Sequence, residues 1–260
     1  MVLQSLIIEL GAASEEPIPT RLNQAIYAQF IEWLSIGNSY LAESVSNSQE
    51  SSFSLSGLIG YRRKDGTRLG DRFLIRISLL NGNLIQPLLQ GIEMYQTPSI
   101  YLDNFPFIIR GIYTVPNSHN LVNISNYESL ANIANFNSEI VLNFISPTSL
   151  QHYRNIQPFP LPDLVFNTLL HRWNYFAPPE LHFSSIQWHS LALAFDLKTQ
   201  FLKINSSTET RREIGCVGWV KYFFPDLQQA RIANILAKFA LFSGIGRKTT
   251  MGMGEVRIIT

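Results

Sequence analysis

The order in which strand-like and helical patterns follow one another is the feature that most constrains the fold of this chain. A strand-like apolar run opens the chain, and a helical pattern, two strand-like runs, a short helix and a last extended region follow it before residue 115. The same order recurs between residues 138 and 259, although the halves share no detectable sequence repeat. This order predicts an α+β fold of two tandem ferredoxin-like (βαββαβ, RRM-like) domains. We expect these domains at residues 1–124 and 125–260, because Asn and Ser are dense between residues 115 and 137.

Individual elements are predicted from the spacing of apolar residues. Leu22, Ile26 and Phe30 recur at helical spacing, whereas residues 72–79 alternate between apolar and more polar positions as a strand does. The polar, Ser-rich stretch from Asn38 to Ser52 is predicted to be a connection without regular structure.

Charge and cysteine content narrow the possible classes of function. Charged residues make up 15% of the chain and the net charge is +1, so an anionic partner must be held by local groups of Lys and Arg. The single cysteine, Cys216, excludes an internal disulfide and a cysteine-based metal site. The chain lacks an apolar run of about 18 residues, and its N-terminus lacks the basic start and cleavage site of a signal peptide. We expect a cytoplasmic protein with no metal, no cofactor and no membrane partner.

Four glycines and two cations lie together in the sequence LFSGIGRKTTMGMG at residues 241–254. A dinucleotide fingerprint requires the order strand, loop, helix, and a P-loop requires Gly directly before Lys. Here the order is helix, loop, strand, and Arg247 precedes Lys248, so both motifs are excluded and a phosphate-binding small-molecule enzyme is disfavoured. Glycine backbones can approach phosphate oxygens closely, and the adjoining cations and hydroxyls add donors, which predicts contact with an anion or a nucleic acid. The alternative is a tight helix-to-strand turn with a capping glycine.

Four stretches of the chain share the features of one known family. They are FSGIGRKTTMGMG, FISPTSL followed by PFPLPDLVFNTLLHRWNYF, IGCVGWVKYFF, and SLSGLIG followed by RFLIRISLL. Together they resemble, in the same order and over most of the chain, the CRISPR-associated repeat-processing endoribonucleases of the repeat-associated mysterious protein superfamily. The first stretch resembles the glycine-rich loop near the C-terminus of that family.

The resemblance implies two ferredoxin-like domains that bind CRISPR repeat RNA, often as a short hairpin, and cut a precursor transcript once in each repeat for antiviral defence. The implied cut needs no metal: the ribose 2′-hydroxyl attacks the neighbouring phosphate and leaves a 2′,3′-cyclic phosphate and a 5′-hydroxyl. Such a cut requires a base, an acid and exact positioning of the RNA. The implied partners are repeat RNA and other subunits of a CRISPR effector complex. The alternative is a non-cleaving subunit of such a complex that keeps the guide RNA bound.

The chain departs from the family pattern where many members carry a histidine, shortly after the first helix. Ser46 stands at that place, and no histidine precedes His119. Three readings remain open. In the first, cleavage uses other groups, with Tyr27, Tyr40, Ser46 or a nearby Lys or Arg as catalytic candidates. In the second, a histidine from elsewhere in the chain serves, and in the third, RNA is bound without efficient cleavage. The pKa of a tyrosine is about 10, so it is a poor base at neutral pH, and the first reading predicts a slow cut.

The residues predicted to contact RNA lie mainly in the glycine-rich stretch. Arg154 follows the sequence SPTSLQHY, where His152 is a further candidate, and Arg172 precedes Trp173 on a predicted helix. Arg172 and Trp173 either form a stacking pair for an unpaired base, or Trp173 packs in the core. The predicted RNA contacts are Gly244, Gly246, Arg247, Lys248, Thr249, Thr250, Gly252, Gly254, Arg154 and Arg172.

Overall fold

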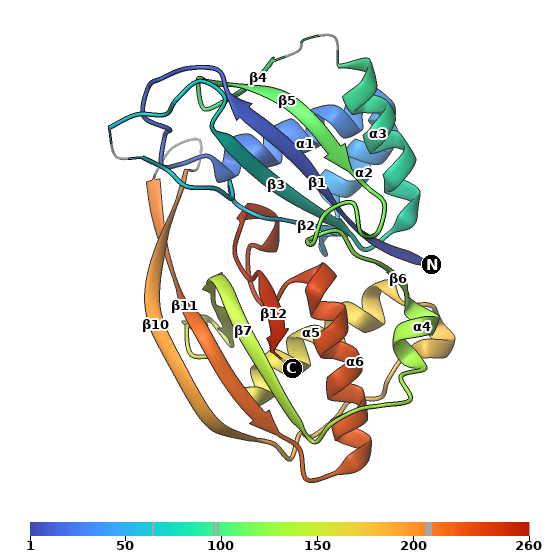
Figure 1. Ribbon diagram of the computed structural model, residues 1–260. Helices are drawn as coiled ribbons and strands as arrows, with labels where there is room; N and C mark the ends of the chain where they lie inside the picture. Colours follow the sequence, from blue (N-terminus) through green and yellow to red (C-terminus); the bar gives the residue numbers. More distant parts are fainter. Residues whose placement is uncertain (64, 96, 98, 206–209, 260) are drawn as a thin grey trace. The chain divides into compact units, whose positions relative to one another are not determined.

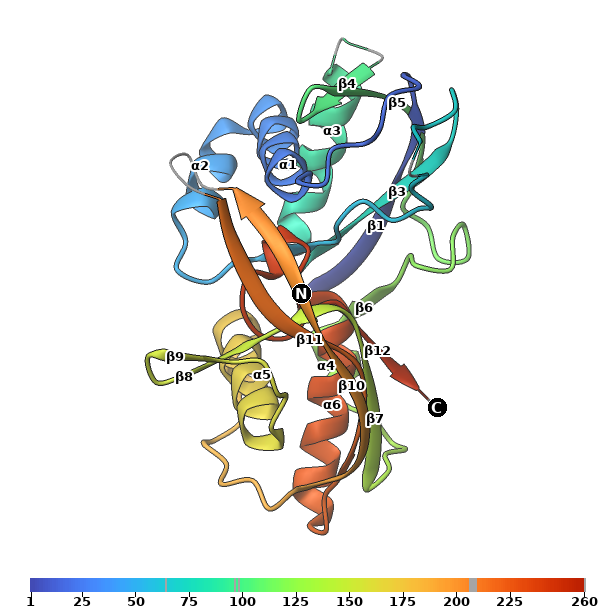
Figure 2. The same ribbon diagram turned by 90° about the vertical axis from the view of Figure 1, so that its left-hand side faces the viewer.

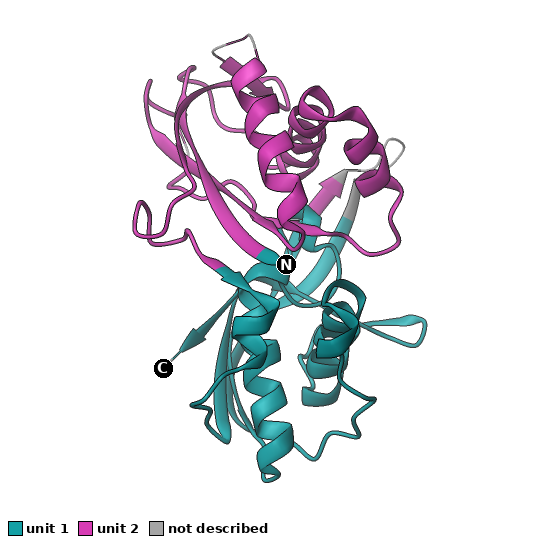
Figure 3. Cartoon of the chain, turned by 90° about the vertical axis from the view of Figure 1, so that its right-hand side faces the viewer, with its two compact units in different colours: residues 1–2, 125–202, 212–260 teal, residues 3–124, 203–211 magenta. Residues whose placement is uncertain are grey.

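The chain divides into two compact units, which Figure 3 shows in different colours. The computed structural model describes residues 1–63, 65–95, 97, 99–205 and 210–259. The N-terminal unit comprises residues 3–124 and 203–211, and the C-terminal unit comprises residues 1–2, 125–202 and 212–260.

The N-terminal unit is built on an antiparallel sheet with the strand order β2-β3-β1-β5-β4 (Figure 1). Along the chain, one strand, two helices, two strands and another helix precede the closing β4–β5 hairpin, which is a ferredoxin-like order with one added strand. Its elements are β1 (Val2–Ala12), α1 (Asn23–Gly37), α2 (Ser39–Asn47), β2 (Phe53–Leu55), β3 (Arg72–Leu79), the 3-10 helix η1 (Gly82–Leu84), α3 (Ile85–Met94), β4 (Ser99–Leu102) and β5 (Phe105–Tyr113).

Helices α1 and α3 pack closely because glycine lies at their contact. A Cβ atom on Gly91 would lie 1.7 Å from the carbonyl oxygen of Trp33, and one on Gly37 would lie 1.9 Å from that of Pro87. Any larger residue would therefore push the two helices apart. Phe30 of α1 in turn stacks on Phe53 of β2, with ring centroids 4.2 Å apart, which fixes α1 against the sheet.

The C-terminal unit has a four-stranded antiparallel sheet with the order β10-β11-β7-β12, and α5 and α6 cover one face of it (Figure 2). Buried and exposed side chains alternate along the paired strands. Val220 and its partner Leu142 are buried, whereas the preceding residue, Trp219, is partly exposed. From residue 124 onward the elements are β6 (Ile124–Asn126), α4 (Tyr127–Ala131), β7 (Glu139–Thr148), β8 (Leu150–His152), β9 (Asn155–Gln157), α5 (Pro162–Phe176), η2 (Pro179–Leu181), β10 (Leu191–Asn205), β11 (Thr210–Phe223), α6 (Leu227–Ser243), η3 (Thr249–Met251) and β12 (Val256–Ile259).

Regular structure lies in the stretch from Asn38 to Ser52, so the prediction of an irregular connection there is wrong. Helix α2 begins directly after Asn38, whose side chain caps it by accepting a hydrogen bond from the Leu41 amide at 3.0 Å. Ala42 packs into the core, while most of the other residues of this helix are exposed. Helix α2 has few apolar residues, so the spacing of apolar residues along the sequence did not indicate a helix there.

The polar stretch between residues 115 and 137 also contains regular structure, namely β6 and α4. Tyr127 of α4 is completely buried, and its ring lies 5.2 Å from that of Trp173 and 5.9 Å from that of Phe239. Tyr127, together with the buried Leu130 and Ala131, thus fixes a segment whose surroundings have the composition of a linker.

The predicted α+β class and the tandem ferredoxin-like arrangement are confirmed, because each unit carries the expected order of helices and strands around one antiparallel sheet. Among the described residues, no helix has the length and apolar character needed to cross a membrane.

Candidate functional site

The glycine loop, which we define as residues 244–254, connects α6 to β12 and is closed by its own backbone. Helix α6 ends at Ser243, and its C-cap is Gly244, whose φ of 67° lies in the left-handed region. This glycine therefore has the capping role that the sequence left as an alternative. The amide of Ile245 donates to the carbonyl of Gly254 at 2.9 Å and joins the two ends of the loop. Ile245 and Met253 are buried. The loop is therefore a fixed part of the C-terminal unit.

The glycine loop is also held against the end of β7 and the residue that follows it. The Arg247 amide donates to the Ser149 carbonyl at 2.9 Å, and the Gly254 amide donates to the Pro147 carbonyl at 3.1 Å. A Cβ atom on Gly246 would lie 2.2 Å from the Ser149 oxygen, and the φ of Gly246 is 82°. Both the backbone conformation and the close approach therefore require glycine at this position.

The outer part of the glycine loop presents amide groups with no partner. Lys248 has a left-handed φ of 55°, and the 3-10 turn η3 follows it. Gly246, Lys248 and Thr250 are partly exposed, and within the described part of the chain their amides donate to no acceptor. Amides in a turn with left-handed residues can form a concavity that binds an anion. The glycine loop thus offers amide donors beside two cationic side chains.

Both cations of the glycine loop are paired with one carboxylate, which sequence reasoning missed. The Arg247 Nη1 atom lies 3.1 Å from Glu213 Oε2, and the Lys248 Nζ atom lies 2.6 Å from Glu213 Oε1. The Glu213 side chain, on β11, is 8% exposed, whereas those of Arg247 and Lys248 are 26% and 31% exposed. Burial acts to raise the pKa of Glu213, but the two cations together hold that pKa below its ordinary value. Each cation keeps further N–H donors for an anionic ligand.

We expect the Glu213 ion pairs to stabilise the fold less as the pH falls. The pKa of Glu213 is lower in the folded protein than in the unfolded chain, where the pKa of a glutamate is about 4.3. The contribution is therefore fully present above the unfolded-state pKa and is lost as the pH falls through the folded-state pKa. Urea unfolding at several pH values between neutral and acidic should show a smaller acid loss of unfolding free energy for Glu213→Gln than for the wild type. Equal acid losses in the two proteins would contradict this expectation.

Arg172 lies beneath the glycine loop and is 4% exposed. Its Nη1 atom donates to the Ser243 carbonyl, at the end of α6, and to Thr249 Oγ1 at 3.3 Å. Burial raises the pKa of the neighbouring Tyr127, and the charge of Arg172 offsets part of that rise. The adjacent Trp173 is completely buried, so it packs in the core and does not form a stacking pair for a base. A direct contact between Arg172 and RNA stays a prediction, and the contacts observed are with the loop and its preceding helix.

The three predicted catalytic residues lie on two helices of the N-terminal unit. Tyr27 of α1 is half-buried, and its ring stacks on Phe53 with centroids 6.0 Å apart. Tyr40 is 78% exposed in the first turn of α2, and Ser46, near the end of that helix, donates its hydroxyl to the Ala42 carbonyl at 2.8 Å. No hydrogen bond joins any two of these three side chains in the part of the chain that the structure describes. Their catalytic role stays a prediction.

Arg154 lies apart from the other predicted RNA contacts, at the tip of the short hairpin formed by β8 and β9. Its side chain is exposed, as is that of His152 in the same hairpin. Among the described residues, no three His, Cys, Asp or Glu side chains are grouped as they would be around a metal ion.

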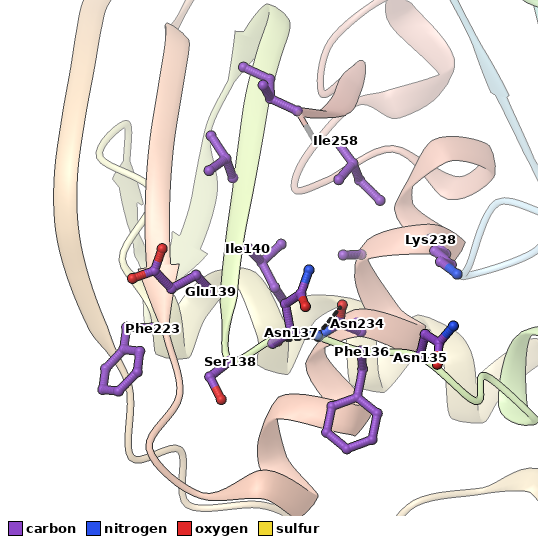
Figure 4. Close-up of a pocket in the computed structure, with 13 residues that line it drawn as sticks. Asn135, Phe136, Asn137, Ser138, Glu139, Ile140, Phe223, Asn234, Lys238 and Ile258 are labelled. Carbon is purple, nitrogen blue, oxygen red and sulfur yellow. Dashed lines mark hydrogen bonds between the residues drawn. The ribbon is translucent and has the colours of Figure 1, made fainter.

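A hollow at the edge of the C-terminal unit is lined by residues 135–138, by β7 and β12, and by Asn234 and Lys238 of α6 (Figure 4). Asn234 closes one side of it by donating to the Asn137 carbonyl at 2.8 Å. Glu139, also in its lining, is ion-paired with Lys221 at 2.9 Å. Ser138, Glu139 and Lys238 line the hollow, but among the described residues no hydrogen bond joins the Ser138 hydroxyl to either of the other two side chains, as a nucleophile and its base would require. It gives no support to a small-molecule enzyme.

Comparison with models of protein families gives a match for the C-terminal part of the chain. Residues 142–256 match the family model of the CRISPR-associated endoribonuclease Cas6, a stretch that contains the whole glycine loop. The resemblance predicted from the sequence is therefore confirmed. Comparison with curated protein sequences finds no match.

Solved structures of Cas6 proteins have a similar fold. The product complex of a Thermus thermophilus Cas6 is 19% identical with a TM-score of 0.81, and the match covers 99% of each chain. A second Cas6 product complex is 24% identical with a TM-score of 0.76 over 100% of each chain. A Cas6-related protein from Pyrococcus furiosus is 17% identical with a TM-score of 0.65, over 100% of this chain and 99% of that one. At these identities the likeness concerns the fold.

Proposed function

We propose that this protein binds CRISPR repeat RNA and cuts the precursor transcript within each repeat. The proposal follows from the match of residues 142–256 to the family model of the CRISPR-associated endoribonuclease Cas6. The cut is metal-independent and leaves a 2′,3′-cyclic phosphate on the upstream fragment. The repeat is bound as a short hairpin, and the product stays available to other subunits of an effector complex. The observation that carries the proposal is the glycine loop, whose amides and paired cations lie within the matched region.

The glycine loop has the chemistry needed to hold an RNA backbone. A phosphate oxygen accepts hydrogen bonds from the amides of Gly246, Lys248 and Thr250, while Arg247 and Lys248 supply charge-assisted donors. Glu213 keeps the two cations in place and limits the positive charge that a non-specific anion meets. Arg172 acts from beneath the loop as a positioning residue through Thr249. Held in this way, the RNA backbone is oriented for reaction, which supplies much of the rate of an intramolecular attack.

The proposed cut forms a bond between the 2′-oxygen and phosphorus and breaks the bond between phosphorus and the 5′-oxygen of the next nucleotide. A base takes the proton of the 2′-hydroxyl, and the departing 5′-oxygen takes up a proton. Tyr27 and Tyr40 are the proton carriers that we assign in the N-terminal unit. Ser46 is less suited, because its hydroxyl proton is already donated to the Ala42 carbonyl. A cut that relies on tyrosine is slow, since a phenol is a weak base at neutral pH.

A non-cleaving role is the second candidate, and a specific observation favours it. The residue at the family's histidine position, Ser46, bonds to its own helix, and no histidine precedes His119 in the sequence. A chain without an efficient base would still hold the repeat through the glycine loop. It would then act as a guide-binding subunit of the effector complex.

Incubation of the purified protein with the repeat RNA of the CRISPR array in its own genome, in the presence of EDTA, tests both candidates. We expect one cut in each repeat, and an upstream fragment whose mass is lower by one water than that of a linear phosphate. An RNA with deoxyribose at the attacking position should be retained on a native gel and should stay intact, because the nucleophile is missing. A second RNA of equal length and unrelated sequence serves as the specificity control.

The other outcomes separate the candidates. Tight retention of an uncut repeat would favour the guide-binding subunit. Cutting of the deoxyribose substrate would exclude attack by the 2′-hydroxyl. Failure to bind the repeat at all would contradict both candidates.

A further inference from the structure

The hairpin of β8 and β9 is an exposed arm that lies outside the glycine loop. Leu150 pairs with Gln157, and His152 pairs with Asn155, so that Tyr153 and Arg154 alone form the turn. Figure 2 shows the hairpin projecting from the C-terminal unit beside α5. Strands this short are marginally stable alone, so the arm depends on what fixes its base.

The tip of the arm carries aromatic surface with no packing role. Tyr153 is 86% exposed, and its ring centroid lies 4.7 Å from that of His152. Its φ of 54° is left-handed, a conformation that tyrosine adopts rarely and that glycine or asparagine would adopt more readily. The Gln151 side chain supports this turn by donating to the Tyr153 carbonyl at 2.7 Å. An exposed ring in an unfavourable backbone conformation contributes little to folding, which points to a ligand contact.

The base of the arm is joined directly to the glycine loop. The Ser149 carbonyl, one residue before the arm, accepts the hydrogen bond from the Arg247 amide. Leu150 is buried, and its Cγ atom lies 3.7 Å from the place where a Cβ on Gly246 would stand. His152 shares a face of the strand with Leu150, because side chains two apart lie on the same side. Tyr153, three residues after Leu150, therefore stands about 10 Å along the strand from this contact with the glycine loop.

We propose that this arm is a site for an unpaired RNA base, which stacks on the ring of Tyr153 while Arg154 contacts the adjoining phosphate. The proposal rests on the proposed function, since the glycine loop brings the RNA to the arm. Aromatic rings and arginine are the groups on which proteins stack single-stranded bases. The exposed side chains of the arm are polar or aromatic, except for that of Ile156 in β9, which is 43% exposed. One exposed aliphatic side chain is too little for the apolar centre of a protein interface, and the arm is joined to the glycine loop through Ser149, which favours RNA over a protein partner.

Tyr153→Asn tests the stacking role, because asparagine keeps the left-handed turn and removes the ring. We expect repeat RNA to bind about tenfold more weakly to Tyr153→Asn, with an unchanged salt dependence, and to bind Tyr153→Phe as it binds the wild type. Arg154→Gln should instead make the salt dependence shallower by about one ion. None of these variants should unfold at a lower temperature than the wild type, since the side chains are exposed and asparagine suits the left-handed turn.

Abasic substitutions at each unpaired position of the repeat identify the base. One of them should weaken binding to the wild type about tenfold and leave binding to Tyr153→Asn unchanged, because the partner ring is already absent. Wild-type affinity of Tyr153→Asn would overturn the arm proposal, as would a loss that no single abasic position reproduces. Variants of Arg247 and Lys248 in the same assay report on the proposed function separately. If they bind weakly while Tyr153→Asn binds normally, only the arm proposal fails, and if they too bind normally, the proposed function fails.

Discussion

Replacing Arg247 and Lys248 by glutamine, in a chain that also carries Glu213→Gln, should weaken the binding of repeat RNA by about 100-fold. Each cation is expected to make a charge-assisted hydrogen bond to phosphate, worth about 1.5 kcal/mol or more, and the variant loses both. The loss should be accompanied by a shallower salt dependence, with the slope of log K against log salt reduced by about 1.4 for single-stranded contacts. Filter binding or fluorescence anisotropy at several salt concentrations measures both quantities.

The variant includes Glu213→Gln because the Glu213 carboxylate forms ion pairs with both Arg247 and Lys248. Removing them alone would leave a carboxylate that is 8% exposed without compensation, and the unit would be destabilised for reasons unrelated to RNA. Glu213→Gln alone is the first control, and it should bind RNA at least as tightly as the wild type, because the net positive charge of the loop rises. Lys221→Gln is the matched second control, since Lys221 forms an ion pair with Glu139 elsewhere in the same unit. An unchanged salt slope in the triple variant would remove the glycine loop from the binding site.

The fold could be predicted from the sequence because its strands and main helices carry regular apolar spacing. Residues such as Ile26 and Phe30 recur at helical intervals and lie in the core of the N-terminal unit. Helix α2 and helix α4 escaped prediction for the opposite reason. In α2 the buried residue is Ala42 and the remainder is mostly polar, whereas α4 spans five residues, too few for helical spacing of apolar residues to repeat.

The glycine loop could be recognised from sequence because glycine is the residue that its backbone requires. Gly246 meets the Ser149 carbonyl too closely for a side chain, and the left-handed glycines stand near one another in the sequence. The groups that support the loop could not be recognised in this way. Glu213 lies 34 residues before Arg247, and Arg172 lies 77 residues before Thr249, with no local pattern to relate them. The pairing of β11 with β7 and the packing of α5 against α6 bring them together.

The internal hydrogen bonds of the glycine loop change what its amides can contribute. The amides of Ile245, Arg247 and Gly254 are committed to the frame that closes and anchors the loop. Those of Gly246, Lys248 and Thr250 have no acceptor among the described residues and remain available to a ligand. The division explains how a glycine-rich segment can be rigid and still bind an anion. Preorganised donors lose little conformational entropy on binding, so the frame contributes to affinity without touching the RNA.

Arg172→Met is expected to lower the melting temperature of the C-terminal unit by about 5–10 °C, corresponding to about 2–3 kcal/mol. The side chain is 4% exposed, and its removal leaves the Ser243 carbonyl and the Thr249 hydroxyl without their donor. Methionine fills much of the space, so the loss reflects hydrogen bonds more than a cavity. Differential scanning calorimetry measures the change. Arg231→Met is the matched control, because Arg231 also donates to a backbone carbonyl, that of Ala131 at 2.9 Å, but is exposed and should lose little stability.

The same variant decides between the two roles of Arg172. A residue that supports the glycine loop from beneath should, when replaced, reduce RNA affinity while leaving the salt slope unchanged, because no phosphate contact is lost. A residue that contacts phosphate directly should make the slope shallower by about 0.7 to 0.9 and change the melting temperature little. Arg172→Lys sharpens the distinction, since lysine keeps the charge but not the guanidinium, whose Nη1 atom donates to both Ser243 and Thr249. If Arg172→Lys restores RNA affinity without restoring the melting temperature, the charge acts on the RNA and the support role is wrong.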